Sequence, residues 1–126
     1  MSRVAAQFRR LAEVAARAAP TLRVDLAVGD LSEFPAYRSF AYCTDNTKPI
    51  RIVVSPRLEH QDDRRIDGIL RHEFGHAVYM LNGDYTHTER DADRLAERLF
   101  GATIRYDADD VQTTGRGVSP RPRRLG

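Results

Sequence analysis

The sequence contains a single cysteine, Cys43, which excludes a disulfide bond within the chain. This agrees with a reducing compartment, and we expect Cys43 to be a small core or strand residue rather than a nucleophile. Long apolar runs are also absent, so no segment approaches the roughly 20 residues of a membrane-spanning helix. The first 20 residues are interrupted by four arginines and one glutamate. They are not typical of a secretory signal, and we expect a cytoplasmic protein that does not enter a membrane.

Acidic residues are absent from the last twelve positions, GRGVSPRPRRLG, which hold four of the chain's 20 Lys and Arg residues. The preceding 114 residues carry 16 basic and 18 acidic side chains, so the net charge of +2 arises at the end of the chain. We expect one domain over residues 1–106 and a flexible basic tail over residues 107–126. The tail could contact nucleic acid or an acidic partner, but a solubilising role is the simpler interpretation.

The spacing of apolar residues changes from the helical period to the strand period near Pro20. Before it, apolar residues recur every three or four positions and predict an amphipathic helix over residues 2–19. After it, alternation of apolar and polar residues predicts strands over residues 22–28 and 36–43, with a third strand over Ile50–Pro56. Turn-forming residues at 44–49 favour a hairpin between the second and third strands.

The helical period returns after residue 62 and predicts two further helices. Asp62 or Asp63 can cap the start of the first, which should end at Asn82 and Gly83. Thr88 can cap the second, which Gly101 should end. Residues 102–107 could form a short extra strand. The overall expectation is an α+β domain with one helix, three strands and two helices.

The segment HEFGH places His72 and His76 four residues apart within the first of these two helices. Residues at that spacing lie on the same face of a helix, one turn apart. Two imidazoles can then reach one metal ion, and Glu73, next to the first histidine, can hold a water molecule beside it. This order of residues suits metal-assisted hydrolysis, with Glu73 as the general base. The plainer alternative is a helix that happens to carry two histidines.

A catalytic zinc site needs a third protein ligand and an open position. The segment GDYTHTERDADR, residues 83–94, is close enough along the chain to supply it. Its candidates include His87, Glu89 and Asp93. Glu89 and Asp93 are four residues apart and share a helix face, so one could bind the metal while the other orients a histidine ligand.

HEFGH followed by Glu89-x-x-Ala92-Asp93 resembles the gluzincin arrangement, and in particular the small phage and bacterial metallopeptidases of the minigluzincin or ImmA/IrrE-like kind. The resemblance extends from Leu22 to Phe100. It implies a minimal zincin-like core with an N-terminal helix, a three-stranded sheet, an active-site helix and a C-terminal Glu helix. It also implies one zinc ion held by His72, His76 and Glu89, with Asp93 supporting a ligand. Peptide or protein substrates would be hydrolysed.

The resemblance also implies that the strand before the active-site helix pairs with the substrate backbone, a role for Ile52, Val53 and Val54. His87 and Tyr85 are candidates for stabilising the oxyanion of the reaction. The linker from His76 to Glu89 is shorter than in many gluzincins. Two alternatives therefore stay open: a zinc-binding regulatory module of low activity, and a SprT-like DNA-associated protease in which His87 is the third ligand.

Overall fold

The structure is a computed structural model, and it describes residues 2–29, 40–46 and 48–101. Three sequence predictions lie wholly or partly outside these residues. They are the part of the second strand before Phe40, the short strand over residues 102–107 and the tail over residues 107–126. The fold below is that of the described residues.

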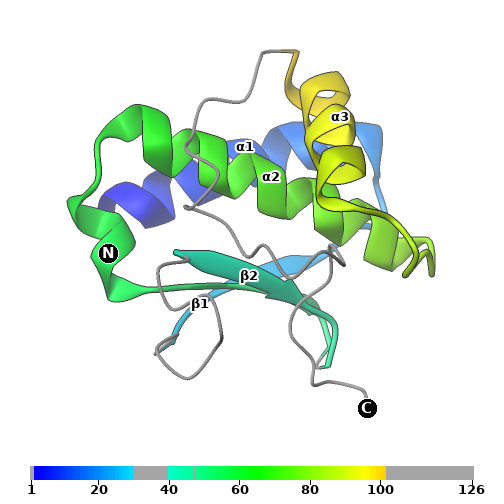
Figure 1. Ribbon diagram of the computed structural model, residues 1–126, viewed down its shortest axis with the longest axis horizontal. Coiled ribbons are helices and arrows are strands. Elements are labelled where there is room, and N and C mark those ends of the chain that lie inside the picture. The colour runs from blue at the N-terminus through cyan, green and yellow to red at the C-terminus, as the bar shows by residue number, and fades with distance from the viewer. Residues whose placement is uncertain (1, 30–39, 47, 102–126) are drawn as a thin grey trace.

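The described chain forms an α+β fold with three α-helices and a three-stranded mixed sheet, as the sequence predicts. Figure 1 shows α1 and α2 lying over the same face of the sheet, with α3 crossing α2. In chain order the elements are α1 (Ser2–Ala18), β1 (Val24–Val28), β2 (Ala41–Thr44), β3 (Ile50–Val54), the 3-10 helix η1 (Pro56–His60), α2 (Asp63–Leu81) and α3 (Glu89–Phe100).

The sheet has the order β1-β3-β2, which places β3 in the centre. Residues 50–54 pair in parallel with β1 and residues 51–54 pair antiparallel with β2. The backbone groups on both sides of β3 are therefore used within the sheet. The prediction that Ile52, Val53 and Val54 pair with a substrate is wrong for this reason, because a substrate strand can add only to an edge.

The core lies between the helices and the sheet, and α2 is its central element. One stripe of α1 is buried there, with Val4 and Ala15 fully covered. Asp62 caps the start of α2 by accepting a hydrogen bond from the Arg65 backbone N–H, as the sequence predicts. Nearly every residue of α2 from Ile66 to Met80 is buried, which fits its place between α1, α3 and the sheet.

Gly75 lets α3 approach α2 closely. A Cβ atom at this position would lie 2.3 Å from the carbonyl oxygen of Ala92 on α3. No side chain fits in that distance, so the missing Cβ sets the spacing of the two helices. The start of α3 is fixed by a capping box between Thr88 and Asp91, and Gly101 ends the helix in the left-handed conformation. Because of these contacts, the first turns of α3 lie close to the two histidines of α2.

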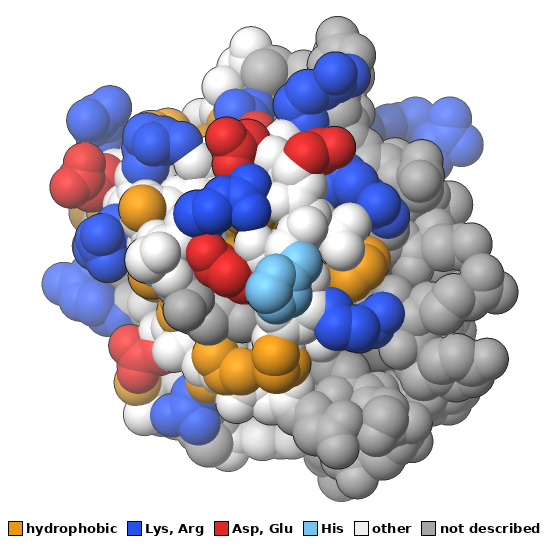
Figure 2. All heavy atoms as spheres, turned by 90° about the vertical axis from the view of Figure 1, so that its left-hand side faces the viewer, with side chains coloured by type: hydrophobic (Ala, Val, Ile, Leu, Met, Phe, Trp, Pro, Cys, Tyr) orange, Lys and Arg blue, Asp and Glu red, His pale blue; other side chains and the backbone are white. Residues whose placement is uncertain are grey.

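Figure 2 shows the face of the molecule that lies on the left-hand side of Figure 1. Basic side chains on this face are interspersed with acidic, apolar and uncharged ones, and they do not form one continuous basic surface. Within the described residues, none of the helices has both the length and the apolar character needed to cross a membrane.

Candidate metal centre

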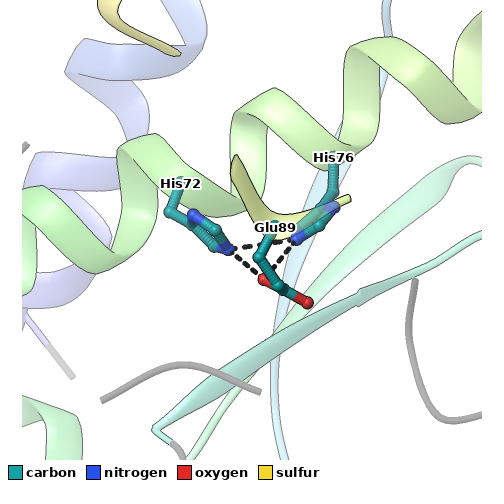
Figure 3. A group of neighbouring side chains, drawn as sticks. All are labelled: His72, His76 and Glu89. Atoms are coloured by element: carbon teal, nitrogen blue, oxygen red, sulfur yellow. Dashed lines mark hydrogen bonds and ion pairs between the residues drawn. The ribbon is translucent and has the colours of Figure 1, made fainter. Parts of the chain in front are cut away.

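His72 and His76 project from neighbouring turns of α2 toward Glu89 at the start of α3, as Figure 3 shows. Their Nε2 atoms lie 3.0 Å apart. The Oε1 atom of Glu89 lies 2.6 Å from Nε2 of His72 and 3.2 Å from Nε2 of His76. Both histidines are buried, with 0% and 4% of their surface exposed. The fold thus brings one carboxylate and two imidazoles together at a single point.

The three side chains fit a metal ion. Each offers one donor atom, and all three atoms lie within 4.8 Å of one another. Around a tetrahedral zinc ion with bonds of about 2.0–2.1 Å, neighbouring donor atoms are separated by roughly 3.3 Å. The observed separations of 2.6, 3.0 and 3.2 Å would have to open only by tenths of an ångström. The buried Oε2 atom of Glu89 also has no hydrogen-bond partner among the described residues.

Asp93 orients the first histidine. Its Oδ1 atom lies 2.6 Å from Nδ1 of His72, one turn of α3 beyond Glu89. A carboxylate can only accept, so Nδ1 of His72 donates to it, and Nε2 is the atom that faces His76 and Glu89. The structure therefore brings Asp93 to the position in which a carboxylate supports a ligating histidine.

Without a metal, protonated His72 and ionised Glu89 attract each other, and this attraction stabilises the arrangement of the side chains. Burial lowers the pKa of His72, but hydrogen bonds to Asp93 and Glu89 and the charges of Glu73 and Glu89 outweigh it and raise the pKa to about 10. Burial raises the pKa of Glu89, yet its contacts with His72 and His76 lower it to about 2. Imidazolium and carboxylate thus face each other at neutral pH. A metal ion entering between them must displace the Nε2 proton of His72.

His76 has a different environment. Burial lowers the pKa of His76, and the positive charge of His72 lowers it further. The contact with Glu89 raises the pKa by less, so the result is about 4 and the His76 ring is neutral at neutral pH. Its Nδ1 atom lies 2.7 Å from Nε2 of His87, which is itself buried. His87 therefore contacts the side of His76 that faces away from Glu89. It does not belong to the group of three donor atoms.

Glu73 lies next to His72 on α2 and is 1% exposed. Its Oε1 atom is buried and has no hydrogen-bond partner among the described residues. Burial raises the pKa of Glu73 to about 8, helped by the charges of Glu89 and Asp93 and opposed by His72. A carboxyl group with a pKa near neutrality and an unused oxygen is suited to accept and return a proton.

Tyr85, which the sequence offered as a candidate, and Cys43 are not among the three donor residues. The Tyr85 side chain is 44% exposed, and its hydroxyl donates a hydrogen bond to the carboxylate of Asp45. None of its described contacts is with the three donor residues. Cys43 is a buried strand residue, as predicted, and its thiol donates to Met80 Sδ at 3.7 Å. Burial and the charge of Glu73 raise the pKa of this thiol, which disfavours a nucleophilic thiolate.

The sequence missed the contact between His87 and His76, because neither residue spacing nor helix periodicity places a loop side chain. Gly75, within the same HEFGH segment, faces the backbone of Ala92. Comparisons of the chain with protein-family models, with curated proteins and with solved structures gave no significant match. The function is therefore argued from the chemistry of the site.

Proposed function

We propose that the protein is a metal-dependent peptidase that binds one zinc ion through His72, His76 and Glu89. The observation that carries this proposal is the convergence of the three donor atoms within 4.8 Å, next to the buried carboxyl group of Glu73. A zinc site with a purely structural role needs no base beside it, and it normally has four protein ligands rather than three. The donor set favours zinc, although manganese, iron or cobalt also accept two imidazoles and a carboxylate.

When bound, such an ion supplies Lewis acidity, which acidifies a water molecule and polarises a substrate carbonyl. The protein's own residues would do the rest. Asp93 holds His72 by its Nδ1–H, and Glu89 closes the group from α3. Glu73 takes the proton of the attacking water on its carboxylate and returns it to the amine that leaves when the peptide bond breaks. A cation nearby lowers the pKa of Glu73 from its metal-free value of about 8 and so keeps the base ionised.

The element order of helix, three strands and two helices, with the histidines on one helix and Glu89 on the next, supports a zincin-like interpretation of the fold. Within that interpretation the substrate backbone does not pair with β3, because β3 already pairs with β1 on one side and with β2 on the other. Substrates would be peptides or proteins.

Two alternatives predict different behaviour from the same residues. A regulatory module would bind the metal but hydrolyse nothing. A SprT-like DNA-associated protease would use His87 as the third ligand. The contact of His87 with the far side of His76 disfavours the second alternative. The mixed charge of the face in Figure 2 offers it no support either.

The test is hydrolysis of a quenched fluorescent peptide library by the full chain loaded with one equivalent of zinc. We expect Glu73→Gln to lower the rate by about 100-fold or more while zinc content stays unchanged, because a general base contributes about 10²- to 10⁴-fold. Glu97→Gln, at an exposed position of α3, is the matched control and should keep full activity. If zinc-loaded wild type and Glu73→Gln cleave at the same background rate, the regulatory module is the better account.

A further inference from the structure

His87 contacts His76 on the side that faces away from Glu89, and the proposed hydrolysis does not use it. It is 3% exposed, and its two ring nitrogens are both engaged. Nε2 lies 2.7 Å from Nδ1 of His76, and Nδ1 lies 2.9 Å from the backbone oxygen of Asp84. We propose that His87 is a positioning residue, which fixes the tautomer and the ring orientation of His76 so that the lone pair of Nε2 of His76 points to the place where the side chains of His72 and Glu89 meet. Its use for metal binding rests on the proposed function above.

The contact between His87 and the backbone oxygen of Asp84 determines which ring nitrogens of His87 and His76 donate and which accept. A backbone carbonyl oxygen can only accept, so Nδ1 of His87 carries the proton that is donated to Asp84. In a neutral imidazole the other nitrogen is then an acceptor, so Nε2 of His87 accepts from Nδ1–H of His76. Neutral His76 is left with a lone pair on Nε2. That is the atom 3.0 Å from His72 and 3.2 Å from Glu89.

The carbonyl of Asp84 is itself held in place relative to α2. The Asp84 N–H donates to the backbone oxygen of Tyr79 at 2.9 Å, and Gly83 supports this turn with φ of 74°. The Asp84 side chain accepts from the backbone N–H of Thr86 at 2.9 Å, which closes a tight turn before His87. The acceptor for His87 is thus fixed by the same helix that carries His76.

The ring plane of His87 is also set by packing. Its imidazole stacks on the ring of Tyr79, one turn of α2 beyond His76, with centroids 4.5 Å apart and planes inclined by 10°. This contact and two hydrogen bonds leave the ring little rotational freedom.

The two histidines of α2 therefore have supports of different chemical type. His72 donates to the carboxylate of Asp93, whereas His76 donates to a ring nitrogen of His87. A second carboxylate here would add negative charge to a buried site that already contains Glu73 and Glu89. His87 orients His76 without that addition, which is a physical reason for a histidine at this position.

The tautomer of His76 can be measured on the full-length protein without any metal. Long-range ¹H–¹⁵N NMR spectra of the ring nitrogens distinguish the Nδ1–H and Nε2–H forms. We expect His76 in wild type to be the Nδ1–H form, and we expect His87→Phe, which keeps a ring to stack on Tyr79 but removes the acceptor, to produce a mixture. His76 found mainly as the Nε2–H form in wild type would overturn the proposal. So would a tautomer that is unchanged in His87→Phe.

Zinc affinity, measured by competition with a chromogenic chelator, is the second readout. Loss of a group that supports a ligating histidine weakens metal binding by about 10- to 100-fold, which is the expectation for His87→Phe. His87→Gln keeps a carbonyl acceptor and should recover part of the affinity. His60→Phe changes an exposed histidine and is the matched control, expected to bind zinc like wild type.

The outcomes separate this inference from the proposed function. Wild-type affinity in His87→Phe would overturn the positioning role. Complete loss of zinc in His87→Phe, together with retention in Glu89→Ala, would make His87 a ligand and would overturn it as well. If wild type takes up no zinc at all, the proposed function fails, and the NMR measurement alone decides whether His87 orients His76.

Discussion

At the scale of single residues, the site depends on carboxyl and imidazole groups that burial places in unusual protonation states. Glu73 is the clearest case, because it is buried, its Oε1 atom has no hydrogen-bond partner within the part of the chain that the structure describes, and its pKa is about 8. A charged carboxylate in such a place destabilises the folded protein. The protein retains it next to His72, which is the position that the proposed hydrolysis needs.

Glu73 should make the stability of the metal-free protein fall as pH rises. Its folded-state pKa of about 8 lies above the usual value of 4.5, so the folded state binds more protons between these values. The contribution of Glu73 to the free energy of unfolding therefore decreases as pH increases from 4.5 toward 8. We expect Glu73→Gln to remove this decrease, with a gain over wild type that approaches a few kcal/mol, as an order of magnitude, near pH 8.

Denaturant unfolding in the presence of a chelator, at intervals from pH 4.5 to 8.5, measures this effect. Glu97→Gln is the control, since Glu97 is exposed on α3 and its substitution should leave the wild-type profile unchanged. A constant difference in stability between Glu73→Gln and wild type over the whole range would show that Glu73 ionises normally.

At the scale of elements, the packing of α3 against α2 assembles the site. Ala92 contacts Gly75, Glu89 lies one turn before that contact and Asp93 directly follows it. Glu89 and Asp93 meet His72 from α3 because the backbones approach so closely. The position of the third donor residue, Glu89, therefore depends on the close approach of α3 that Gly75 allows at Ala92.

Gly75→Ala should push α3 away from α2, because the new Cβ would lie 2.3 Å from the Ala92 carbonyl oxygen. We expect a loss of stability of about 1–3 kcal/mol, as is usual for overpacking, together with weaker zinc binding. Gly101→Ala is the control. It strains a residue with φ of 67° at the far end of α3, so it should lower stability without changing zinc affinity. Thermal unfolding and chelator competition measure both quantities, and unchanged zinc affinity in Gly75→Ala would contradict this account.

The sequence predicts the elements that local patterns define. The caps at Asp62 and Thr88, the helix end at Gly83 and the shared face of His72 and His76 follow from spacing and residue type, and the structure confirms them. Strand order does not follow from local pattern, since the apolar pattern indicates which faces of a strand are buried and does not indicate which strands are its neighbours. The expectation that β3 pairs with a substrate came from the family resemblance, and the central place of β3 in the sheet contradicts it. The contact between His87 and His76 also depends on a loop, and helical periodicity does not place it.

At the scale of the whole molecule, the proposed metal would link α3 to α2 and so to the rest of the described fold. His72 and His76 belong to α2, which packs against the sheet and α1, while Glu89 begins α3. An ion bound by all three would oppose separation of the two helices. Metal binding and global stability should therefore be coupled.

Zinc should raise the thermal midpoint of the wild-type protein. At a free concentration 100 times its dissociation constant, a ligand that binds only the folded state adds about 2.7 kcal/mol, which is roughly 10 °C for a domain of this size. Glu89→Ala should show little or no shift under the same conditions. Differential scanning calorimetry with and without zinc makes the comparison. A wild-type thermal midpoint that does not change with zinc would argue against coupling between metal binding and stability.

The most direct test of the central claim is the metal content of the purified full-length protein, determined by elemental analysis. Wild type, Glu89→Ala and the exposed-site control Glu97→Ala would be compared after incubation with zinc and removal of the excess. We predict about one zinc ion per chain in wild type and in Glu97→Ala, and none in Glu89→Ala. Wild type without zinc after this treatment would mean that HEFGH is a helical segment with two histidines and no metal, and the peptidase proposal would be wrong.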